Sequence, residues 1–371
     1  MKLTAEMIKA RARELGIDCI AIGNIERFAG APTLMSPSTY FPGARSVIAI
    51  AMRIPRGTYR GIEEGTHWHN YTFYSYNKLN SLLRPRLTYA LASFIEDHGW
   101  EAVCHYPGVP EGQGTTKKPL RADGIVPDIY CSVRIVAAGC GLGEIGYSKV
   151  FLTKEFGPRV RIGLIFTDCE LEPDPILDTG EICIHCGACA KECPGNAIPP
   201  IKEENHRLTV DFGEKRIWYG DVRMGRCTLS HHGMNSECSP FLKKEFPNFS
   251  LNVRDSEMTE EEAYILCYTM GRAEWWRKPG GGKAIGYYDY ILNHTGYFAI
   301  CGARGCIRAC MNALEKAGRT ENKFKNPFYR KKSWTLSAAP DRIPEGVNHY
   351  REEYLDAHYP GIRENEYKKT E

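Results

Sequence analysis

The sequence predicts an α/β fold, a sandwich of helices on a sheet, followed by a smaller cysteine-rich module. Two observations predict this division. Apolar strand-like runs alternate with helix-like segments over residues 1–175, and cysteines then recur from Cys183 to Cys310. The 371 residues and a hydrophobic content of 43% suit two or three domains with a sizeable core. The formal net charge of +3 gives no argument for nucleic-acid binding.

The first elements follow from capping residues and apolar runs. Thr4 and Gly16 bracket an amphipathic helix as its N-cap and its stop. Short apolar runs predict strands over residues 19–25 and 46–52, the second after a Pro-Gly turn.

The next segment alternates in the same way. Leucines at helical spacing predict a long helix from Tyr76 to Gly99, with a kink at Pro85. A strand over 100–106 precedes a Gly-, Pro- and Lys-rich loop at 107–118 that is expected to shape a pocket mouth. Further on we expect a helix over about 130–138, a buried strand over 159–171 and an acidic helix around residue 260.

The N-terminus is not expected to be an export signal, because no apolar region follows its basic residues. No window reaches about 18 continuous apolar residues, so no membrane span is expected either. We therefore expect a cytoplasmic protein, in which thiols stay reduced.

The cysteines of "ICIHCGACAKECPGNAI" have the spacing C-x2-C-x2-C-x3-C-P, which binds a 4Fe–4S cluster. Cys183, Cys186 and Cys189 would lie on one tight loop around this cluster, and Cys193 is the fourth cysteine of the run. A structural zinc site usually shows two separated C-x2-C pairs, and disulfides need an oxidising compartment, so both alternatives are disfavoured. In two-cluster ferredoxins the fourth cysteine of such a run binds the other cluster.

A second cysteine set, "ICGARGCIRACMNAL", contains Cys301, Cys306 and Cys310 but is irregular. By the ferredoxin analogy, one cluster takes the first three cysteines of the run and Cys310. The other takes Cys193, Cys301, Cys306 and one distant thiol. The candidates for that thiol are Cys227, Cys238 and Cys267, of which Cys227 is our choice. A single cluster with the remaining cysteines in the core is the alternative.

Two quoted stretches carry a family resemblance. "CGLGEIGYSKVFLTKEFGPRVRIGLIFTDCELEPD" followed by "DTGEICIHCGACAKECPGNAI" resembles corrinoid (cobalamin)-dependent reductive dehalogenases and, more loosely, epoxyqueuosine reductases. The resemblance implies a nitroreductase-like cobalamin-binding core over 1–175 and a ferredoxin-like two-cluster module over 176–320. That module would contain an insert at about 205–295, and residues 321–371 would form an extended C-terminal wrap.

The resemblance also implies cofactor and substrate residues. Gly141, Gly143 and Ser148 would contact the corrinoid, although a helix C-cap is the commoner use of such a glycine turn. Arg161 would stabilise an anion or lower a tyrosine pKa, with a structural ion pair as its alternative. Asp128 would be a general acid, with a helix N-cap as its alternative.

A tyrosine would complete this site by protonating the substrate carbon. Tyr76 is our choice, while Tyr71 and Tyr74 compete for the role and a core position is the default for each. His231 and His232 stand near Cys227 in the sequence and are expected either at the surface or at the site.

The resemblance implies a reductase that passes electrons from reduced ferredoxin or flavodoxin through two 4Fe–4S clusters to a corrinoid. The substrate would be a small organic molecule, an organohalide among the candidates. An electron-transfer or corrinoid-activating protein is one alternative. An epoxyqueuosine-reductase-like enzyme is another, disfavoured because no helical-repeat tail is recognised and only Lys117, Lys118 and Arg121 form a basic group. No nucleic-acid partner is therefore expected.

Overall fold

A computed structural model describes residues 3–64, 69–106, 122, 124, 129–239, 242, 249–272 and 299–328. All of these lie in one compact unit, Met1–Trp334. A second unit, Thr335–Glu371, lies outside the described residues, as does much of the predicted C-terminal wrap. The predicted division at residues 175 and 320 stays a prediction.

The N-terminal elements confirm the expectations from capping. Helix α1 (Ala5–Glu14) begins where the Thr4 hydroxyl accepts a hydrogen bond from the backbone N–H of Met7. It ends before Gly16, whose φ of +79° is the left-handed conformation that favours glycine. Strand β1 (Cys19–Asn24) and strand β2 (Ser46–Arg53) follow close to their predicted bounds.

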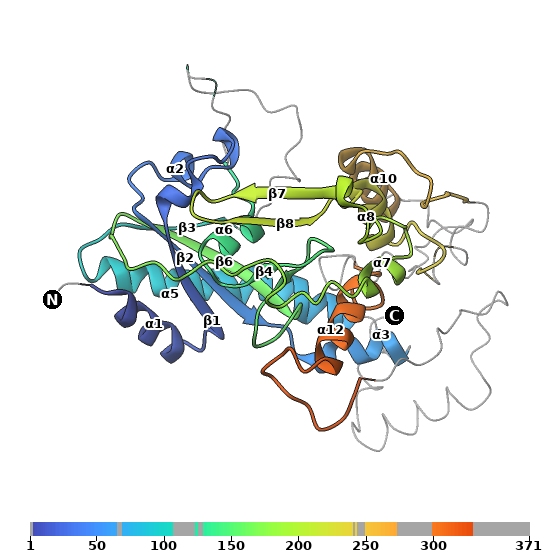
Figure 1. The fold of residues 1–371 in the computed structure, drawn as a ribbon, viewed down its shortest axis with the longest axis horizontal. Helices are drawn as coiled ribbons and strands as arrows, with labels where there is room; N and C mark the ends of the chain where they lie inside the picture. The colour runs from blue at the N-terminus through green and yellow to red at the C-terminus, as the bar shows by residue number, and fades with distance from the viewer. Residues whose placement is uncertain are drawn as a thin grey trace, which may run out of the picture. The chain divides into compact units, whose positions relative to one another are not determined.

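Four strands form the central sheet, in the order β1-β2-β6-β3 (Figure 1). Strand β3 spans Ala102–Cys104 and β6 spans Val160–Thr167, and all three pairings are antiparallel. The fold is thus mixed α and β, as predicted. Seven of the eight residues of β2 are buried, because β2 is an inner strand with both faces covered.

Alternate residues of the inner strands face two different layers. Ala49 and Leu164 belong to a core shared with α6 (Val133–Gly139). On the other face, Gly163 of β6 lies against Arg84 and Thr88 of α5 (Arg84–Glu96), where an added Cβ would come within 2.9 Å of Thr88. The sheet is therefore covered by helices on both faces, which is the predicted sandwich.

The predicted long helix begins earlier and changes its winding. It comprises α4 (His69–Tyr71), two π-helical stretches, η4 (Thr72–Asn77) and η5 (Leu79–Leu83), and then α5. Pro85 lies in the first turn of α5, where its missing N–H is tolerated. Wide π turns inside helices are often found at functional sites.

The second half of the described chain is built from short elements. It contains two hairpins, β4 (Glu144–Ile145) with β5 (Phe151–Leu152) and β7 (Arg207–Asp211) with β8 (Arg216–Gly220). The helices are α7 (Ala188–Lys191), α8 (Met224–His231), α10 (Glu260–Arg272) and α12 (Cys306–Lys316). Helix α10 is the predicted acidic helix.

Several shorter turns complete the described elements. They are η1 (Ile25–Phe28), η2 (Thr33–Met35), α2 (Pro37–Tyr40), η3 (Arg56–Tyr59), α3 (Arg60–Glu64) and η7 (Glu204–His206). In the part of the chain that the structure describes, no helix combines the length and apolar character that a membrane span requires.

A largely buried ion pair ties α12 to the sheet region. The guanidinium of Arg56 donates to both carboxylate oxygens of Glu315, at 2.9 and 2.6 Å. Arg56 is 7% exposed and also lies over the ring of Phe324, 4.3 Å from its centroid. Removing one partner of such a pair leaves an uncompensated buried charge, which is strongly destabilising.

Candidate functional site

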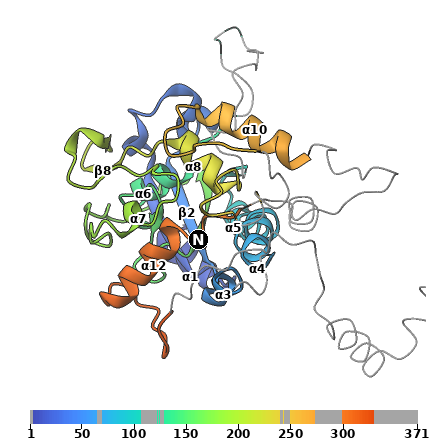
Figure 2. The same cartoon turned by 90° about the vertical axis from the view of Figure 1, so that its right-hand side faces the viewer.

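One cavity brings together the thiols that the sequence analysis assigns to the first cluster. It is lined by Cys183, Cys186 and Cys189 of the run and by Cys310 of α12, together with Gly146, Tyr147 and Ser148 of the β4–β5 turn. Helix α12 reaches the run because it packs against α7 (Figures 1 and 2). Four thiols around one cavity are the donor set that a 4Fe–4S cluster needs, so these residues fit the cluster.

A tight turn gives the run its shape. His185 and Gly187 have φ values of +48° and +72°, so the chain reverses between successive cysteines. The imidazole of His185 also stacks on Trp218 of β8, with ring centroids 4.7 Å apart. Cys186 is exposed, whereas Cys183 and Cys189 are half-buried, so one edge of this cavity faces solvent.

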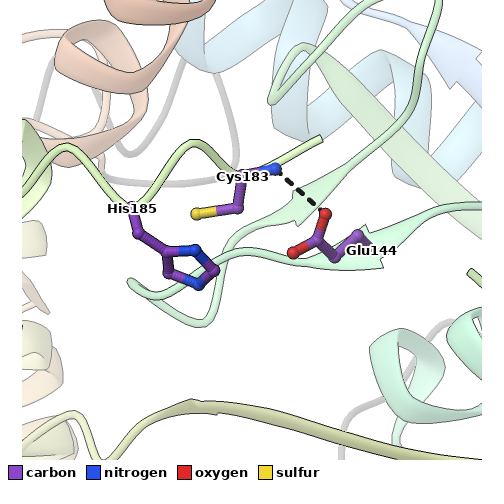
Figure 3. Close-up of side chains that lie close together, drawn as sticks. All are labelled: Glu144, Cys183 and His185. Atoms are coloured by element: carbon purple, nitrogen blue, oxygen red, sulfur yellow. Dashed lines mark hydrogen bonds between the residues drawn. The ribbon is translucent and has the colours of Figure 1, made fainter. Parts of the chain in front are cut away.

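Glu144 of β4 holds the backbone that leads into this run (Figure 3). One carboxylate oxygen accepts the N–H of Gly180 at 2.7 Å. The other accepts the N–H groups of Ile182 at 2.7 Å and Cys183 at 2.9 Å. The side chain is buried, and burial raises the pKa of Glu144, although the three hydrogen bonds oppose this shift.

A carboxylate oxygen of Glu144, Cys183 Sγ and a ring nitrogen of His185 lie within 4.8 Å of one another. This trio has the composition of a single-metal site. The carboxylate, however, is already engaged by three backbone donors, and Cys183 belongs to the four-thiol cavity. The arrangement therefore suits a support for the cysteine loop better than a separate metal site.

The thiols assigned to the second cluster lie near one another. Burial raises the pKa of Cys306 well above its ordinary value, and the next contributions come from Cys227 and Cys193. For Cys301 the largest cause of a raised pKa is a hydrogen bond with Cys238, and Cys306 and Cys193 also contribute. These mutual effects place the thiols in one neighbourhood.

The three candidates for the distant ligand differ in their surroundings. Burial raises the pKa of Cys227 to about 12, and Cys193 is the next contributor. Cys238 lies beside Cys301, as noted above. Cys267 instead directs its thiol to the carbonyl of Thr228, at 3.9 Å, and only burial is a raising cause for its pKa, which rises to about 12. Cys227 and Cys238 thus remain candidates by position.

A second group of side chains surrounds Arg161 of β6. Its Nε donates to the carbonyl of Ser75 at 2.7 Å, and its guanidinium lies 4.2 Å from the centroid of the Tyr76 ring. The sequence analysis places Arg161 and Tyr76 in one site, and in the structure the two side chains lie together. Burial alone would lower the pKa of Arg161, but Tyr76 and Tyr71 outweigh it and raise that pKa.

The three competing tyrosines occupy different positions. Tyr71 is fully buried and Tyr76 half-buried, with ring centroids 5.7 Å apart, whereas Tyr74 is 49% exposed. Burial raises the pKa of Tyr71 well above its ordinary value. The winding of η4 turns Tyr74 toward solvent and leaves the other two beside Arg161.

His231, at the end of α8, joins this group. Its ring lies 5.5 Å from that of Tyr76, and burial, with His232 and Arg161 as smaller causes, lowers the pKa of His231 well below 6.5. The imidazole is therefore neutral at pH 7. The sequence showed only a histidine pair near Cys227, and nothing in it indicated contact with a residue on η4.

The glycine turn after α6 is closed by the chain itself. A Cβ on Gly141, whose φ is +82°, would lie 2.3 Å from the carbonyl oxygen of Pro175. A Cβ on Gly143 would lie 2.1 Å from the carbonyl oxygen of Leu152. Ser148 lines the four-thiol cavity instead. The assignment of these three residues to a corrinoid stays a prediction that this geometry does not support.

Some predicted residues lie outside the described residues. They are Asp128 and the basic group Lys117, Lys118 and Arg121. Among the cysteines outside the two cluster sets, Cys19, Cys140 and Cys169 are buried and Cys104 is half-buried.

Comparisons with known proteins add a relationship. No family model matches the chain. Over 70 residues it is 43% identical to a tetrachloroethene reductive dehalogenase from Desulfitobacterium hafniense, covering 18% of this chain and 13% of that protein. Over 174 residues it is 28% identical to an epoxyqueuosine reductase from Bacillus cereus, covering 44% and 38%.

Solved structures of the same two kinds are also similar. A reductive dehalogenase structure, reported with a mechanism for B12-dependent dehalogenation, matches with 17% identity and a TM-score of 0.44, covering 91% of this chain and 42% of that one. An epoxyqueuosine reductase with a tRNA stem loop matches with 20% identity and a TM-score of 0.34, covering 52% of each chain. Both scores are too low to support a functional argument.

The chain spans well under half of the curated relatives it matches, so their activities remain proposals for it. Both groups of relatives are named as reductive enzymes. The chain is thus similar to reductive dehalogenases over a short segment and, more distantly, to epoxyqueuosine reductases over a longer one.

Proposed function

We propose that this protein is an iron–sulfur reductase of the reductive-dehalogenase type, with two 4Fe–4S clusters and a corrinoid, acting on a small organic substrate. The observation that carries the proposal is the cavity lined by Cys183, Cys186, Cys189 and Cys310. These thiols come from two distant segments, and the ferredoxin analogy pairs the same four.

The order of the sites supports a direction of electron flow. Cys186 is exposed, so a reduced ferredoxin or flavodoxin would deliver electrons to the first cluster. In the second thiol set Cys301 is buried, while its other assigned thiols are half-buried. Its neighbour Gly302 lies against Tyr71, where an added Cβ would come within 2.5 Å of the hydroxyl oxygen. The second cluster would therefore lie between the first cluster and the group around Arg161.

The group around Arg161 fits a bound polar molecule. Arg161 Nη2 and Tyr59 Oη are buried without a hydrogen-bond partner in the described part of the chain. Such groups are costly to bury unless a ligand or water pairs with them. A corrinoid bound there would supply a strongly reducing metal centre. Cofactor contacts by Gly141 and Gly143 are not part of this proposal.

The protein's own residues would then act on the substrate. Arg161 carries a fixed positive charge that would stabilise a leaving anion. Tyr76 has a hydroxyl that would donate a proton, and the neutral ring of His231 would help to exclude water beside it. Asp128 as a general acid, and a cytoplasmic location, stay predictions.

The test compares Tyr76→Phe with Tyr74→Phe, since Tyr74 is exposed on the same helical stretch. Anaerobically reconstituted protein would be assayed with reduced viologen and a halogenated phenol. We expect Tyr76→Phe to lower kcat by about a hundredfold or more, and Tyr74→Phe to leave it unchanged. Equal rates for both variants and the wild type would remove Tyr76 from the mechanism. Cluster reduction without turnover of any substrate would favour the electron-transfer alternative.

An epoxyqueuosine-reductase-like activity is the second candidate, because the 174-residue match extends over 44% of the chain. An epoxyqueuosine reductase is among the sequence relatives, so the comparisons do not support the expectation that no nucleic acid takes part. Saturable binding of an epoxyqueuosine-modified stem loop, with reduction of its base, would favour this candidate. Binding no stronger than to an unmodified stem loop would exclude it.

A further inference from the structure

Glu144 is a buried ionisable residue for which the proposed reaction has no use. It lies on β4, which pairs with β5 so that Glu144 stands opposite Leu152. Gly143, the residue before Glu144, packs closely on the backbone of Leu152. The carboxylate therefore lies on a paired strand, next to a close backbone contact.

The carboxylate determines where the backbone amides of the cysteine loop point. The N–H groups of Ile182 and Cys183 donate to the same oxygen of Glu144, at 2.7 and 2.9 Å. Figure 3 shows the nitrogen of Cys183 directed at Glu144 and its sulfur on the opposite side. Both donors are thus engaged by the carboxylate of Glu144.

Cluster reduction potentials depend on hydrogen bonds to the sulfurs and on nearby charge. Donors that reach the sulfurs stabilise the more negative, reduced cluster, whereas a nearby carboxylate disfavours it. Glu144 disfavours the reduced cluster both by engaging amide donors and by its negative charge. It withholds two amides from the cluster, and one of its oxygens lies within 4.8 Å of Cys183 Sγ.

We propose that Glu144 is a positioning residue that orients the Cys183 loop and keeps the first cluster at a low reduction potential. The inference rests on the proposed function, because it requires a cluster bound by Cys183, Cys186, Cys189 and Cys310. It adds a role for a residue that is itself no ligand.

The test uses Glu144→Gln in the full chain, reconstituted anaerobically with iron and sulfide. Glutamine keeps the size of the side chain, but its NH2 group cannot accept the amide hydrogens. Glu181→Gln is the matched control, because Glu181 lies in the same loop, is exposed and accepts the N–H of Asp178 instead. Iron and sulfide are quantified, and each cluster is titrated with dithionite and followed by electron paramagnetic resonance.

We expect Glu144→Gln to make reduction of the first cluster at least about tenfold more favourable, a shift of about 59 mV. The second cluster and the Glu181→Gln protein should match the wild type. Selective loss of the first cluster from a folded Glu144→Gln protein would also support the positioning role. Full occupancy at the wild-type potential would overturn it.

A second variant keeps the inference testable if the Glu144→Gln protein does not fold. Glu144→Asp keeps the charge, but its shorter side chain cannot hold all three amides. We expect it to fold, with the potential of the first cluster displaced from that of the wild type. An unchanged potential would overturn the inference. A wild-type chain that binds no cluster would instead refute the proposed function, and this inference with it, before any variant is compared.

Discussion

The glycine turn after α6 has either a structural role or a cofactor-binding role. The variant Gly141→Ala tests which of the two it has. Gly141 and Gly213 have nearly identical φ values, +82° and +83°. A Cβ on Gly141 would lie 2.3 Å from the carbonyl oxygen of Pro175, whereas a Cβ on Gly213 would meet nothing within 4 Å. The two alanine variants therefore share the conformational penalty and differ only in the clash.

The expected effects can be worked from this geometry. An L-residue in the left-handed conformation costs roughly 1–2 kcal/mol, which is all that Gly213→Ala should lose. The forced contact in Gly141→Ala adds roughly 1–3 kcal/mol, because backbone at Pro175 must shift. The total for Gly141→Ala is then about 2–5 kcal/mol.

Thermal unfolding of the two proteins, followed by circular dichroism without added corrinoid, measures this difference. We expect a lower Tm for Gly141→Ala than for Gly213→Ala, by roughly 1–2 °C for each kcal/mol of extra cost. Equal Tm values would refute the structural account. If Gly141→Ala then weakened only corrinoid binding, the original assignment of the turn to the cofactor would stand.

Three further outcomes are expected. Cys227→Ser should lower the iron content of the reconstituted chain by about half, whereas Cys267→Ser should leave it unchanged; the reverse result would exclude Cys227 as a ligand. Arg56→Ala should destabilise the fold by about 3–5 kcal/mol in a denaturant titration, because it leaves the mostly buried carboxylate of Glu315 unpaired, whereas Arg216→Ala at an exposed pair should have little effect. Burial, with a nearby arginine, lowers the pKa of His105 from 6.5 to about 4 in the folded chain. As pH falls from 7 to 5 the unfolded chain takes up this proton first, so the wild type should lose roughly 2 kcal/mol more than His105→Gln, and equal losses would contradict this reasoning.

Local signals predicted the fold well where one residue decides the local geometry. Thr4 and Gly16 defined α1, and the apolar runs defined β2 and β6. The same signals did not show that the sheet is antiparallel, because strand direction depends on which distant strands pair. The π-helical winding of η4 was also not apparent, since the leucine spacing there suits an α-helix equally well.

The candidate site could be predicted from the sequence where the spacing of the cysteines defines its chemistry. The cysteine run specified the first cavity, and the ferredoxin analogy added Cys310 from α12. The role of Glu144 was missed, although one acidic residue in the apolar stretch "GLGEIG" was a usable signal. His231 could not have been placed against Tyr76, because that contact depends on how α8 packs beside η4.

The central claim is that this one chain binds two 4Fe–4S clusters. Anaerobic reconstitution followed by quantification of iron, acid-labile sulfide, zinc and cobalt tests it most directly. We expect about eight irons and eight sulfides per chain, with cobalt retained after corrinoid is added. Stoichiometric zinc, or about four irons with the second thiol set still free, would contradict it.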